Sequence, residues 1–460
     1  MLSAKTANNT FFITALFFVF FCLLDVISRQ FVAKVRKKNC TFALRMTKLP
    51  QAFADYTRQM MGDERFERYL KSFGQEPPVS IRLNPHKAEG LTAIDAEPVP
   101  WCRDGYYLKK RPNFTMDPLL HAGCYYVQEA ASMFLDEVLR QAVQGTVPLC
   151  DLSHSWDSPR NALDLCAAPG GKSTLLRAAL PDDCVLYSNE PVRNRFNILS
   201  ENVQKWGYDN HIVTCQYARD FRKAKQKFDL ILCDVPCSGE GMFRKDPATI
   251  NEWSPQNVEK CWRLQRDIVA DIWPCLNDGG ILIYSTCTFN TKENEENVRW
   301  LLSEFDAEVL PVDIKSEWNI TGSLLEGFAE PVYRFIPGIS RGEGLFMCVL
   351  RKKGERSAVR DKGHDQRQAQ RQTILSPHHA NHSPLRAELS YQQAIAFLRG
   401  EALQLPEDTP RGEVEVCFEG HPLGLVKNIG TRANNLYPKA WRIKTTHIPP
   451  EYEPILSIKI

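Results

Sequence analysis

The sequence contains no C-x-x-C pair, although it has 15 cysteines among 460 residues. This absence excludes a zinc ribbon and a thioredoxin-type redox motif, and we predict no metal site. Net charge is nearly absent too, since 57 basic residues face 55 acidic ones, so whole-chain charge indicates no partner. With 43% hydrophobic and 24% charged residues, the composition is that of an ordinary folded protein. A chain of about three domains builds its core without disulfides, so we expect free cysteines in a cytoplasmic, reducing compartment.

The sequence also lacks the run of about 20 apolar residues that a membrane-spanning helix needs. Its most apolar stretch, Phe11 to Leu24, is fourteen residues long, and basic residues follow it. If this stretch inserted, those basic residues would keep everything downstream on the cytoplasmic side. A new amphipathic pattern begins at Met46. We therefore interpret residues 1–45 as upstream translation that the working protein lacks, with a membrane-tethered form as the alternative.

Strand-like and helix-like segments alternate from Ala162 to about Lys352. The strand candidates are ALDLCAA, CVLYSNE, FDLILCDVP, GGILIYSTCT and GLFMCVLRK. Such alternation predicts an α/β fold with a mainly parallel sheet and helices on both faces. Upstream, a helical periodicity over residues 49–83 ends in the short strand SIRLNP, and GCYYVQEAASMFLDEVL enters a helix.

Composition divides the chain into five parts. After the extension of residues 1–45 we predict an N-terminal subdomain at 46–135, a central α/β core at 136–352, a basic flexible linker at 353–386 and a compact C-terminal domain at 387–460. Residues 351–386 hold nine Lys or Arg against three Asp or Glu and very few large apolar residues. A segment of this kind cannot fold alone. A solvated linker is the favoured interpretation, and contact with nucleic-acid phosphates is the alternative.

The string LDLCAAPGGKST is a strand followed by a turn of small residues and a helix. Small residues at such a turn allow the backbone to approach a ligand closely. The string matches neither G-x-G-x-x-G nor G-x-x-x-x-G-K-[ST], which excludes the usual dinucleotide and nucleotide-triphosphate loops. Glu190 ends the next strand about 20 residues later, where an acid binds a ribose diol. We favour a ligand loop over a purely structural tight turn.

Two cysteines and an aspartate follow the ends of two other predicted strands. FDLILCDVPCSGEG carries Asp234 and Cys237, and GGILIYSTCT carries Cys287. Strand ends in parallel sheets face the same crevice, so the three side chains should converge. Cysteine is usually a small core residue, but Cys237 and Cys287 lie beyond the apolar stretches, among Pro, Ser, Gly and Thr.

Taken together, these strings resemble the Sun-type RNA cytosine-C5 methyltransferases. CAAPGGK is similar to the S-adenosylmethionine loop of that family, DVPCSGEG to its motif IV and STCT to its motif VI, while SIRLNP and YVQEAAS match preceding blocks. The resemblance implies a Rossmann-like class I methyltransferase fold with an N-terminal α/β RNA-binding subdomain and a small C-terminal PUA-like β domain. The tail, GHPLGLVKNIGTRANNLYPKAWRIK, is similar to the RNA-binding end of the bacterial 16S rRNA members.

The resemblance also implies a role for each site residue. Cys287 is the nucleophile, Asp234 the partner of cytosine N3 and Cys237 the residue that assists product release. Addition of a thiolate to C6 makes C5 electron-rich enough to accept a methyl group, which is covalent catalysis. The residues expected at the cofactor are Cys166, Ala167, Ala168, Pro169, Gly170, Gly171, Lys172, Glu190, Arg195 and Asp234; for Arg195 a surface salt bridge is the alternative.

One position departs from the family pattern. The acid that members carry near the adenine is replaced here by Tyr217, and Asp220 follows three residues later. Tyr217 could stack on or hydrogen-bond the adenine, or Asp220 could substitute for the missing acid. The sequence does not choose between them.

Cations and aromatic rings together indicate RNA as the partner. RKDP, residues 244–247, is expected near the crevice mouth. The tail carries Lys427, Arg432, Lys439, Arg442 and Lys444 beside Tyr437 and Trp441. An ordinary small barrel with a core tryptophan is the alternative for this tail. We expect a monomer acting on 16S rRNA or the small ribosomal subunit. A tRNA methyltransferase and a non-catalytic RNA-binding assembly factor are the alternatives, the latter disfavoured by two strand-end thiols.

Overall fold

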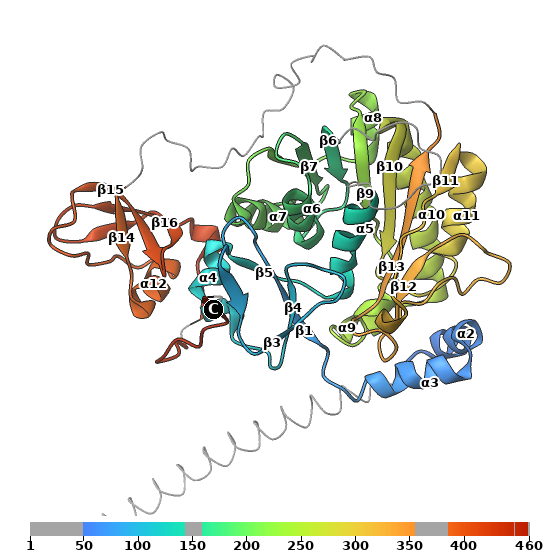
Figure 1. The fold of residues 1–460 in the computed structure, drawn as a ribbon, viewed down its shortest axis with the longest axis horizontal. Helices are drawn as coiled ribbons and strands as arrows, with labels where there is room; N and C mark the ends of the chain where they lie inside the picture. Colours follow the sequence, from blue (N-terminus) through green and yellow to red (C-terminus); the bar gives the residue numbers. More distant parts are fainter. Residues whose placement is uncertain (1–48, 143–158, 355–384, 446, 459–460) are drawn as a thin grey trace, which may run out of the picture.

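The computed structural model describes residues 49–142, 159–354, 385–445 and 447–458 (Figure 1). The predicted extension, residues 1–45, and nearly all of the predicted linker, residues 353–386, lie outside the described residues. Within the described ranges the strands form a central eight-stranded sheet, two four-stranded sheets and one two-stranded sheet.

The central sheet has the strand order β11-β13-β10-β9-β6-β7-β8, with β12 paired to β13. Its strands are β6 (Asn161–Asp164), β7 (Val185–Asn189), β8 (His211–Thr214), β9 (Phe228–Asp234), β10 (Leu276–Thr286), β11 (Ala307–Val309), β12 (Tyr333–Phe335) and β13 (Leu345–Lys352). The strands from β6 to β10 run parallel, and β13 pairs antiparallel with β10. The mainly parallel sheet confirms the predicted fold class. The short strands β8, β11 and β12 were not predicted.

Helices cover both faces of this sheet. They are α5 (Phe134–Ala142), α6 (Gly171–Ala179), α7 (Arg193–Trp206), α8 (Ala218–Lys223), α9 (Ala248–Glu252), α10 (Pro255–Ile272) and α11 (Glu295–Glu304). Alternate residues of β9 enter different cores: Leu230 packs with residues of α5 and α6, whereas Ile231 packs with residues of α10 and α11. A strand buried on both faces reads as a continuous apolar run, which explains why β9 was recognisable in the sequence. Helix α10 begins where Ser254 caps it and Pro255 occupies the first turn.

The N-terminal sheet has the order β3-β4-β1-β5 and is antiparallel. Its strands are β1 (Val79–Leu83), β3 (Ala96–Pro98), β4 (Gly105–Leu108) and β5 (Tyr125–Val127), with α4 (Pro118–Ala122) beside them and β2 (Leu91–Ala93) outside the sheet. The first helices, α2 (Gln51–Met61) and α3 (Asp63–Ser72), do not pack on this sheet. Their Phe53 and Tyr69 rings contact Phe243 and Phe289, which lie in the loops after β9 and β10. The helices α2 and α3 lie on the far side of the molecule from α4 (Figure 1).

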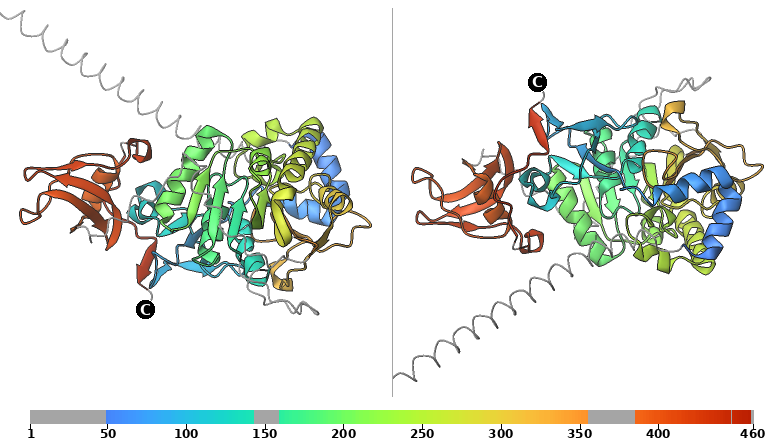
Figure 2. Two further views of the ribbon diagram at one scale, coloured as in Figure 1. Left: turned by 90° about the horizontal axis from the view of Figure 1, so that it is seen from above. Right: turned by 90° about the horizontal axis from the view of Figure 1, so that it is seen from below.

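The C-terminal sheet has the order β14-β15-β16-β17. Its elements are β14 (Arg386–Glu388), α12 (Tyr391–Leu398), β15 (Gly412–Phe418), β16 (His421–Asn428) and β17 (Ala433–Asn435). It lies at one end of the molecule in all three views (Figures 1 and 2). Its core is continuous with that of the N-terminal sheet, since Leu119 of α4 and Val426 of β16 belong to one buried cluster. The last strand, β18 (Leu456–Ile458), returns to pair with β2.

Candidate active site

The predicted catalytic residues gather at the carboxyl-terminal edge of the central sheet. Asp234 ends β9, and Cys287 follows Thr286, the last residue of β10. The two strands are parallel neighbours, with Ser285 opposite Asp234. On the other side of β9 lies β6, which leads into the CAAPGGK loop. Because the chain order reverses between β6 and β9, this edge is the switch point at which α/β sheets bind ligands.

Two thiols from different strand ends meet at this edge. The Sγ atoms of Cys237 and Cys287 lie 3.1 Å apart, and the Cys287 N–H donates to Cys237 Sγ at 3.3 Å. Both cysteines are free and half-buried. The hydrogen bond with Cys287, burial, and the charges of Cys287 and Glu293 raise the pKa of Cys237 well above its usual range. Cys237 therefore keeps its proton beside the sulfur of Cys287.

Lys172 and Asp234 form an ion pair next to the thiols. Lys172 is the second residue of α6, and its Nζ donates to Asp234 Oδ2 at 2.8 Å. Burial lowers the pKa of Lys172, but the charge and hydrogen bond of Asp234 and the charge of Cys287 outweigh it, so the pKa lies above its ordinary value. A permanent ammonium here holds the Asp234 carboxylate in place beside the thiols.

The cofactor loop runs from the end of β6 to the first turn of α6 and contains Cys166, Ala167, Ala168, Pro169, Gly170, Gly171 and Lys172. Gly170 has φ +116°, a conformation that strains any other residue, and a Cβ there would lie 3.3 Å from Leu199 Cδ1. The loop is anchored at both ends, because Ala167 N donates to Asn189 O at 2.8 Å and Asn202 Nδ2 donates to Pro169 O at 2.8 Å.

Two buried carboxylates flank this loop. Glu190 is 1% exposed, its Oε1 accepts from Val192 N, and its Oε2 has no hydrogen-bond donor among the described residues. Asp164, which sequence reasoning missed, is fully buried; its Oδ2 accepts from Ser173 Oγ and its Oδ1 has no donor there either. Burial raises the pKa of Asp164 to about 7. Asp164 Oδ1 and Glu190 Oε2 are therefore buried acceptors without a hydrogen-bond donor among the described residues, although Glu190 Oε2 has a salt-bridge partner. Such acceptors beside a glycine turn fit a ligand that offers ribose hydroxyls and an amino group, as S-adenosylmethionine does.

Arg195 joins Glu190 to the cofactor loop. Its guanidinium lies 3.3 Å from Glu190 Oε2 and donates to Ala168 O at 2.9 Å. The salt bridge weighed as an alternative is therefore present, and it also tethers the loop. The side chain itself is half-exposed.

Residues of SIRLNP and YVQEAAS support the start of α6. Arg82 of β1 is 2% exposed and donates from Nε to Gln128 Oε1 at 2.8 Å and from its guanidinium to Thr174 Oγ1 at 2.7 Å. It also reaches Gly171 O at 3.4 Å. The N-terminal sheet thus fixes the helix that carries Lys172. Both strings were recognised as motifs in the sequence, but the structural roles of Arg82 and Gln128 were not predicted.

The position that departs from the family pattern belongs to a helix cap. Tyr217 is the N-cap of α8, its ring is 58% exposed, and its N–H donates to Asp220 Oδ2 at 3.0 Å. The Asp220 carboxylate therefore completes a capping box. The choice between Tyr217 and Asp220 at the adenine stays open.

Two side chains in the segments expected to face RNA are buried. Arg244 of RKDP does not present its charge to the crevice mouth, because its side chain is buried and lies 3.2 Å from the buried carboxylate of Glu343. Tyr437 is also buried, with its ring packed against Phe397, so it is not free to stack on a base. Trp441 is half-buried and lies under the ammonium of Lys205, 5.4 Å from the ring centroid.

The described parts of the chain contain no cluster of three or more potential metal ligands. In those same parts no helix has the length and apolar character needed to cross a bilayer. The apolar stretch Phe11 to Leu24 lies outside them.

Comparisons with known proteins match this arrangement part by part. Family models match residues 49–130 (N-terminal domain of 16S rRNA methyltransferase RsmF), 156–351 (16S rRNA methyltransferase RsmB/F) and 384–443 (methyltransferase RsmF PUA domain). Ribosomal RNA small subunit methyltransferase F of Pectobacterium atrosepticum is 34% identical over 66% of this chain and 63% of that relative. Its counterpart in Erwinia tasmaniensis is 26% identical over 85% of this chain and 96% of that relative.

A solved structure supports the same grouping. The crystal structure of a methyltransferase homologue from Pyrococcus horikoshii has a TM-score of 0.54 at 27% identity, over 67% of this chain and 97% of that one. The fold and the site define a class I methyltransferase that uses S-adenosylmethionine. The chain belongs to the 16S rRNA methyltransferase RsmB/F family, the Sun-type family that its motifs resemble.

Proposed function

We propose that this chain methylates C5 of a cytosine in 16S rRNA through a covalent bond between Cys287 and cytosine C6. The observation that carries this proposal is the convergence of two thiols, 3.1 Å apart, beside the Lys172–Asp234 ion pair. A module that only binds RNA has no use for such a pair at a ligand-binding edge. The relatives named ribosomal RNA small subunit methyltransferase F support 16S rRNA over tRNA as the substrate.

The residues divide the reaction between them. The Cys287 sulfur forms a bond to C6, and the C5–C6 π electrons become available at C5. Asp234, held by Lys172, accepts a hydrogen bond from the exocyclic amine and shares with N3 the proton that leaves the Cys287 thiol, so the charge that develops as the sulfur adds is neutralised; this proton returns when the C6–S bond breaks. Bound S-adenosylmethionine supplies an electrophilic methyl group.

Product release reverses the addition. The C5 proton leaves to water, its bond electrons restore the C5–C6 double bond, and the C6–S bond breaks with its electrons returning to Cys287. Cys237, as a neutral thiol in contact with that sulfur, donates a hydrogen bond to it as negative charge returns. No net proton is consumed by the protein in this sequence.

For cofactor binding we propose the loop from Cys166 to Lys172 together with Glu190, Arg195 and Asp234. Glu190 accepts hydrogen bonds from the ribose hydroxyls, and Gly170 permits close approach of the backbone. Arg195 acts through the loop, because its guanidinium contacts Ala168 O and the Glu190 carboxylate.

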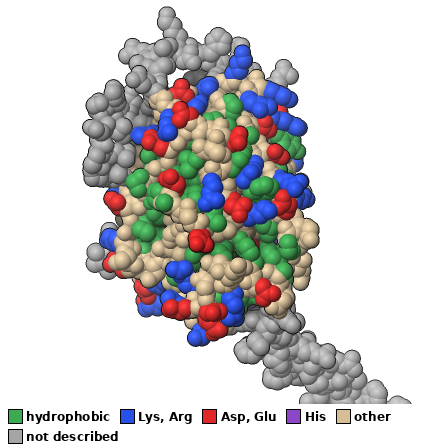
Figure 3. All heavy atoms as spheres, turned by 90° about the vertical axis from the view of Figure 1, so that its right-hand side faces the viewer, with side chains coloured by type: hydrophobic (Ala, Val, Ile, Leu, Met, Phe, Trp, Pro, Cys, Tyr) green, Lys and Arg blue, Asp and Glu red, His purple; other side chains and the backbone are tan. Residues whose placement is uncertain are grey.

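RNA must deliver its target base out of the helical stack, since the thiols lie at the edge of a packed sheet. We propose that the N-terminal subdomain, residues 46–135, and the C-terminal domain, residues 387–460, bind the surrounding RNA. Exposed cations on the latter include Lys427, Arg432, Lys439 and Lys444. The opposite end of the molecule mixes both signs of charge (Figure 3), so no single-sign surface marks it for phosphates.

One chain supplies both thiols, the cofactor loop and the tail, so we propose a monomer. We place it in the cytoplasm, where its ribosomal substrate and reduced thiols are found. The test incubates the full chain with S-adenosylmethionine and unmodified 16S rRNA, followed by bisulfite sequencing. One protected cytosine in 16S rRNA supports the proposal; protection of a tRNA cytosine instead, or of none, contradicts it.

A further inference from the structure

The segment around Cys237 is held from both sides by one buried carboxylate. Glu293, six residues after Cys287, is fully buried. Its Oε2 accepts from Ser238 N at 3.0 Å and from Gln265 Nε2 at 2.7 Å. The same Gln265 amide donates to Pro236 O at 2.9 Å. Pro236 and Ser238 are the two neighbours of Cys237, so Glu293 fixes the backbone after this thiol directly and the backbone before it through Gln265 of α10.

The partners of Glu293 require a carboxylate at this position. Every group that meets its oxygens is a donor: the backbone N–H of Ser238, the amide of Gln265, and Asn290 Nδ2 at 2.8 Å. Asn290 cannot turn its oxygen toward Glu293, because that oxygen already accepts from Glu293 N. An amide in place of the carboxylate would direct a donor at another donor.

A second glutamate keeps the two loops in register. Glu240 Oε2 accepts from Phe289 N at 2.8 Å and from Asn290 N at 2.9 Å, while its Oε1 accepts from Trp253 Nε1 at 3.0 Å. Glu240 follows Cys237 and Phe289 follows Cys287, so these hydrogen bonds join the two cysteine-bearing loops at a second point, beyond the thiols.

The buried groups around Glu293 also interact through their charges. Burial and the charge of Glu240 raise the pKa of Glu293 to about 7. Glu293 in turn is one of the charges that raise the pKa of Cys237, together with the hydrogen bond and charge of Cys287 and with burial. Tyr284 and Cys261 are the other ionisable side chains that face this group.

We propose that Glu293 is a positioning residue that holds the Cys237 thiol against Cys287 and thereby supports product release. This inference rests on the proposed function, in which Cys287 forms the adduct and Cys237 assists its breakdown. Loss of Glu293 should therefore slow breakdown of the protein–RNA adduct more than it slows RNA binding.

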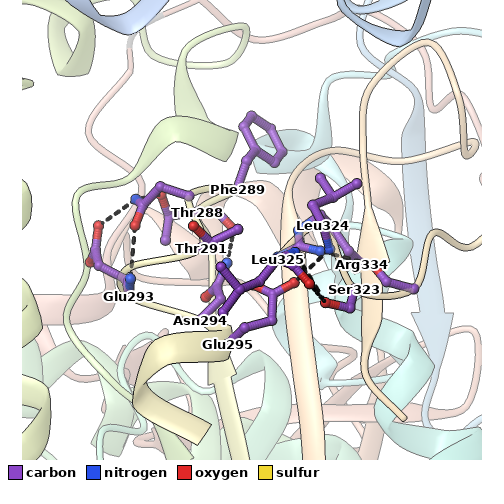
Figure 4. A network of polar contacts seen from close by, with 12 residues as sticks. Thr288, Phe289, Thr291, Glu293, Asn294, Glu295, Ser323, Leu324, Leu325 and Arg334 are labelled. Atoms are coloured by element: carbon purple, nitrogen blue, oxygen red, sulfur yellow. Dashed lines mark hydrogen bonds and ion pairs between the residues drawn. The ribbon is translucent and has the colours of Figure 1, made fainter. Parts of the chain in front are cut away.

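The chain offers a matched control on the same loop. Glu295 is also fully buried, but it pairs with Arg334 at 2.6 Å and accepts from Leu324 N at 2.8 Å. Figure 4 shows the two carboxylates leaving the loop on opposite sides, with Glu295 directed toward Arg334. Among the described residues no contact joins Glu295 to the Cys237 segment.

The experiment compares the full chain with Glu293→Gln, Cys237→Ala and Glu295→Gln on 16S rRNA with S-adenosylmethionine. It measures kcat, the KM for RNA, and the fraction of protein that migrates as an RNA adduct on a denaturing gel. We expect Glu293→Gln to raise the adduct fraction at least threefold over wild type and to lower kcat without raising KM. Glu295→Gln should show the wild-type adduct fraction.

Each outcome decides the question. An unchanged adduct fraction in Glu293→Gln, while Cys237→Ala traps RNA, overturns the positioning role; so does an equal rise in Glu295→Gln, which would indicate general loosening of the loop. Absence of adduct in Cys237→Ala contradicts the release role of Cys237 in the proposed function itself. If Glu293→Gln does not fold, Gln265→Leu removes the hydrogen bonds from Gln265 to Pro236 O and to Glu293 while the carboxylate stays in place, and a wild-type adduct fraction in that variant overturns the inference.

Discussion

Cys237 and Cys287 stand 50 residues apart in the chain, yet their sulfur atoms lie 3.1 Å from each other. Two adjacent parallel strands bring them to the same sheet edge, and two buried glutamates interlock the loops that carry them. In this arrangement Cys237 keeps its proton, because the hydrogen bond with Cys287 and burial raise the pKa of Cys237.

Replacing Cys287 with alanine should reduce methylation at least roughly 10³-fold, because the covalent route to an electron-rich C5 is lost. RNA affinity should stay within a factor of about two, since the thiol is a small part of the RNA contact. Transfer of labelled methyl groups to 16S rRNA and a filter-binding assay measure the two quantities. Activity comparable to wild type would remove Cys287 as the nucleophile.

Replacing Lys172 with methionine should lower kcat by about 10²-fold, the usual cost of removing one preorganised charge from a polar site. The ammonium holds Asp234 at 2.8 Å and lies within the field of Cys287. Arginine at this position should recover only part of the activity, because a planar guanidinium does not fit the point-charge geometry. Steady-state kinetics on both variants make the test; full activity in the methionine variant would contradict it.

The pH dependence of stability should report the burial of Asp164. Its pKa is raised to about 7, so the folded protein binds this proton more tightly than the unfolded chain does. Stability from this group is present at low pH and is lost as the pH rises from about 4 to about 7. Compared with wild type, Asp164→Asn without cofactor should therefore gain relative stability between pH 5 and pH 8. Urea unfolding at both pH values measures this difference; an equal difference at both would show that the carboxyl is not perturbed.

The tail should contribute to RNA binding through exposed cations rather than through Tyr437. The double variant Lys427→Glu and Arg432→Glu should weaken RNA binding about tenfold and reduce the slope of log affinity against log salt by about 1 to 2. Lys223→Glu, on the exposed surface of α8, is the matched control. Equal losses in the variant and the control would argue against a specific role for the tail.

Deletion of residues 387–460 would be a poor substitute for these point changes. The tail shares a buried cluster with the N-terminal sheet, including Phe397 and Val416, and Tyr452 donates to the buried Asp117 carboxylate at 3.1 Å. Exposing several such side chains at about 1.5–3 kcal/mol each approaches the whole stability of a domain, about 5–15 kcal/mol.

The sequence was sufficient to predict the parallel sheet, because strands such as β9 are buried on both faces and read as uninterrupted apolar runs. It also predicted the convergence of Asp234, Cys237 and Cys287, since parallel strands end at one edge. It could not predict Glu293 or Arg82. Each is a polar residue whose partners lie on distant segments, so no local pattern distinguishes it from a solvated side chain.

The packing partners of α2 and α3 likewise could not be predicted from the sequence. An amphipathic helix shows which face it buries but not what that face meets, and here Tyr69 meets Phe289 beside the Cys287 loop. The same reason explains Tyr437, which read as an exposed ring among cations and proved to be part of a core.

The most direct test of the account is the adduct formed by Cys237→Ala with 16S rRNA and S-adenosylmethionine. Protease and nuclease digestion followed by mass spectrometry should find a C5-methylated cytosine attached to the peptide that contains Cys287. A methylated product without any adduct, or an adduct attached to another residue, would contradict the central claim that Cys287 forms the bond and Cys237 helps to break it.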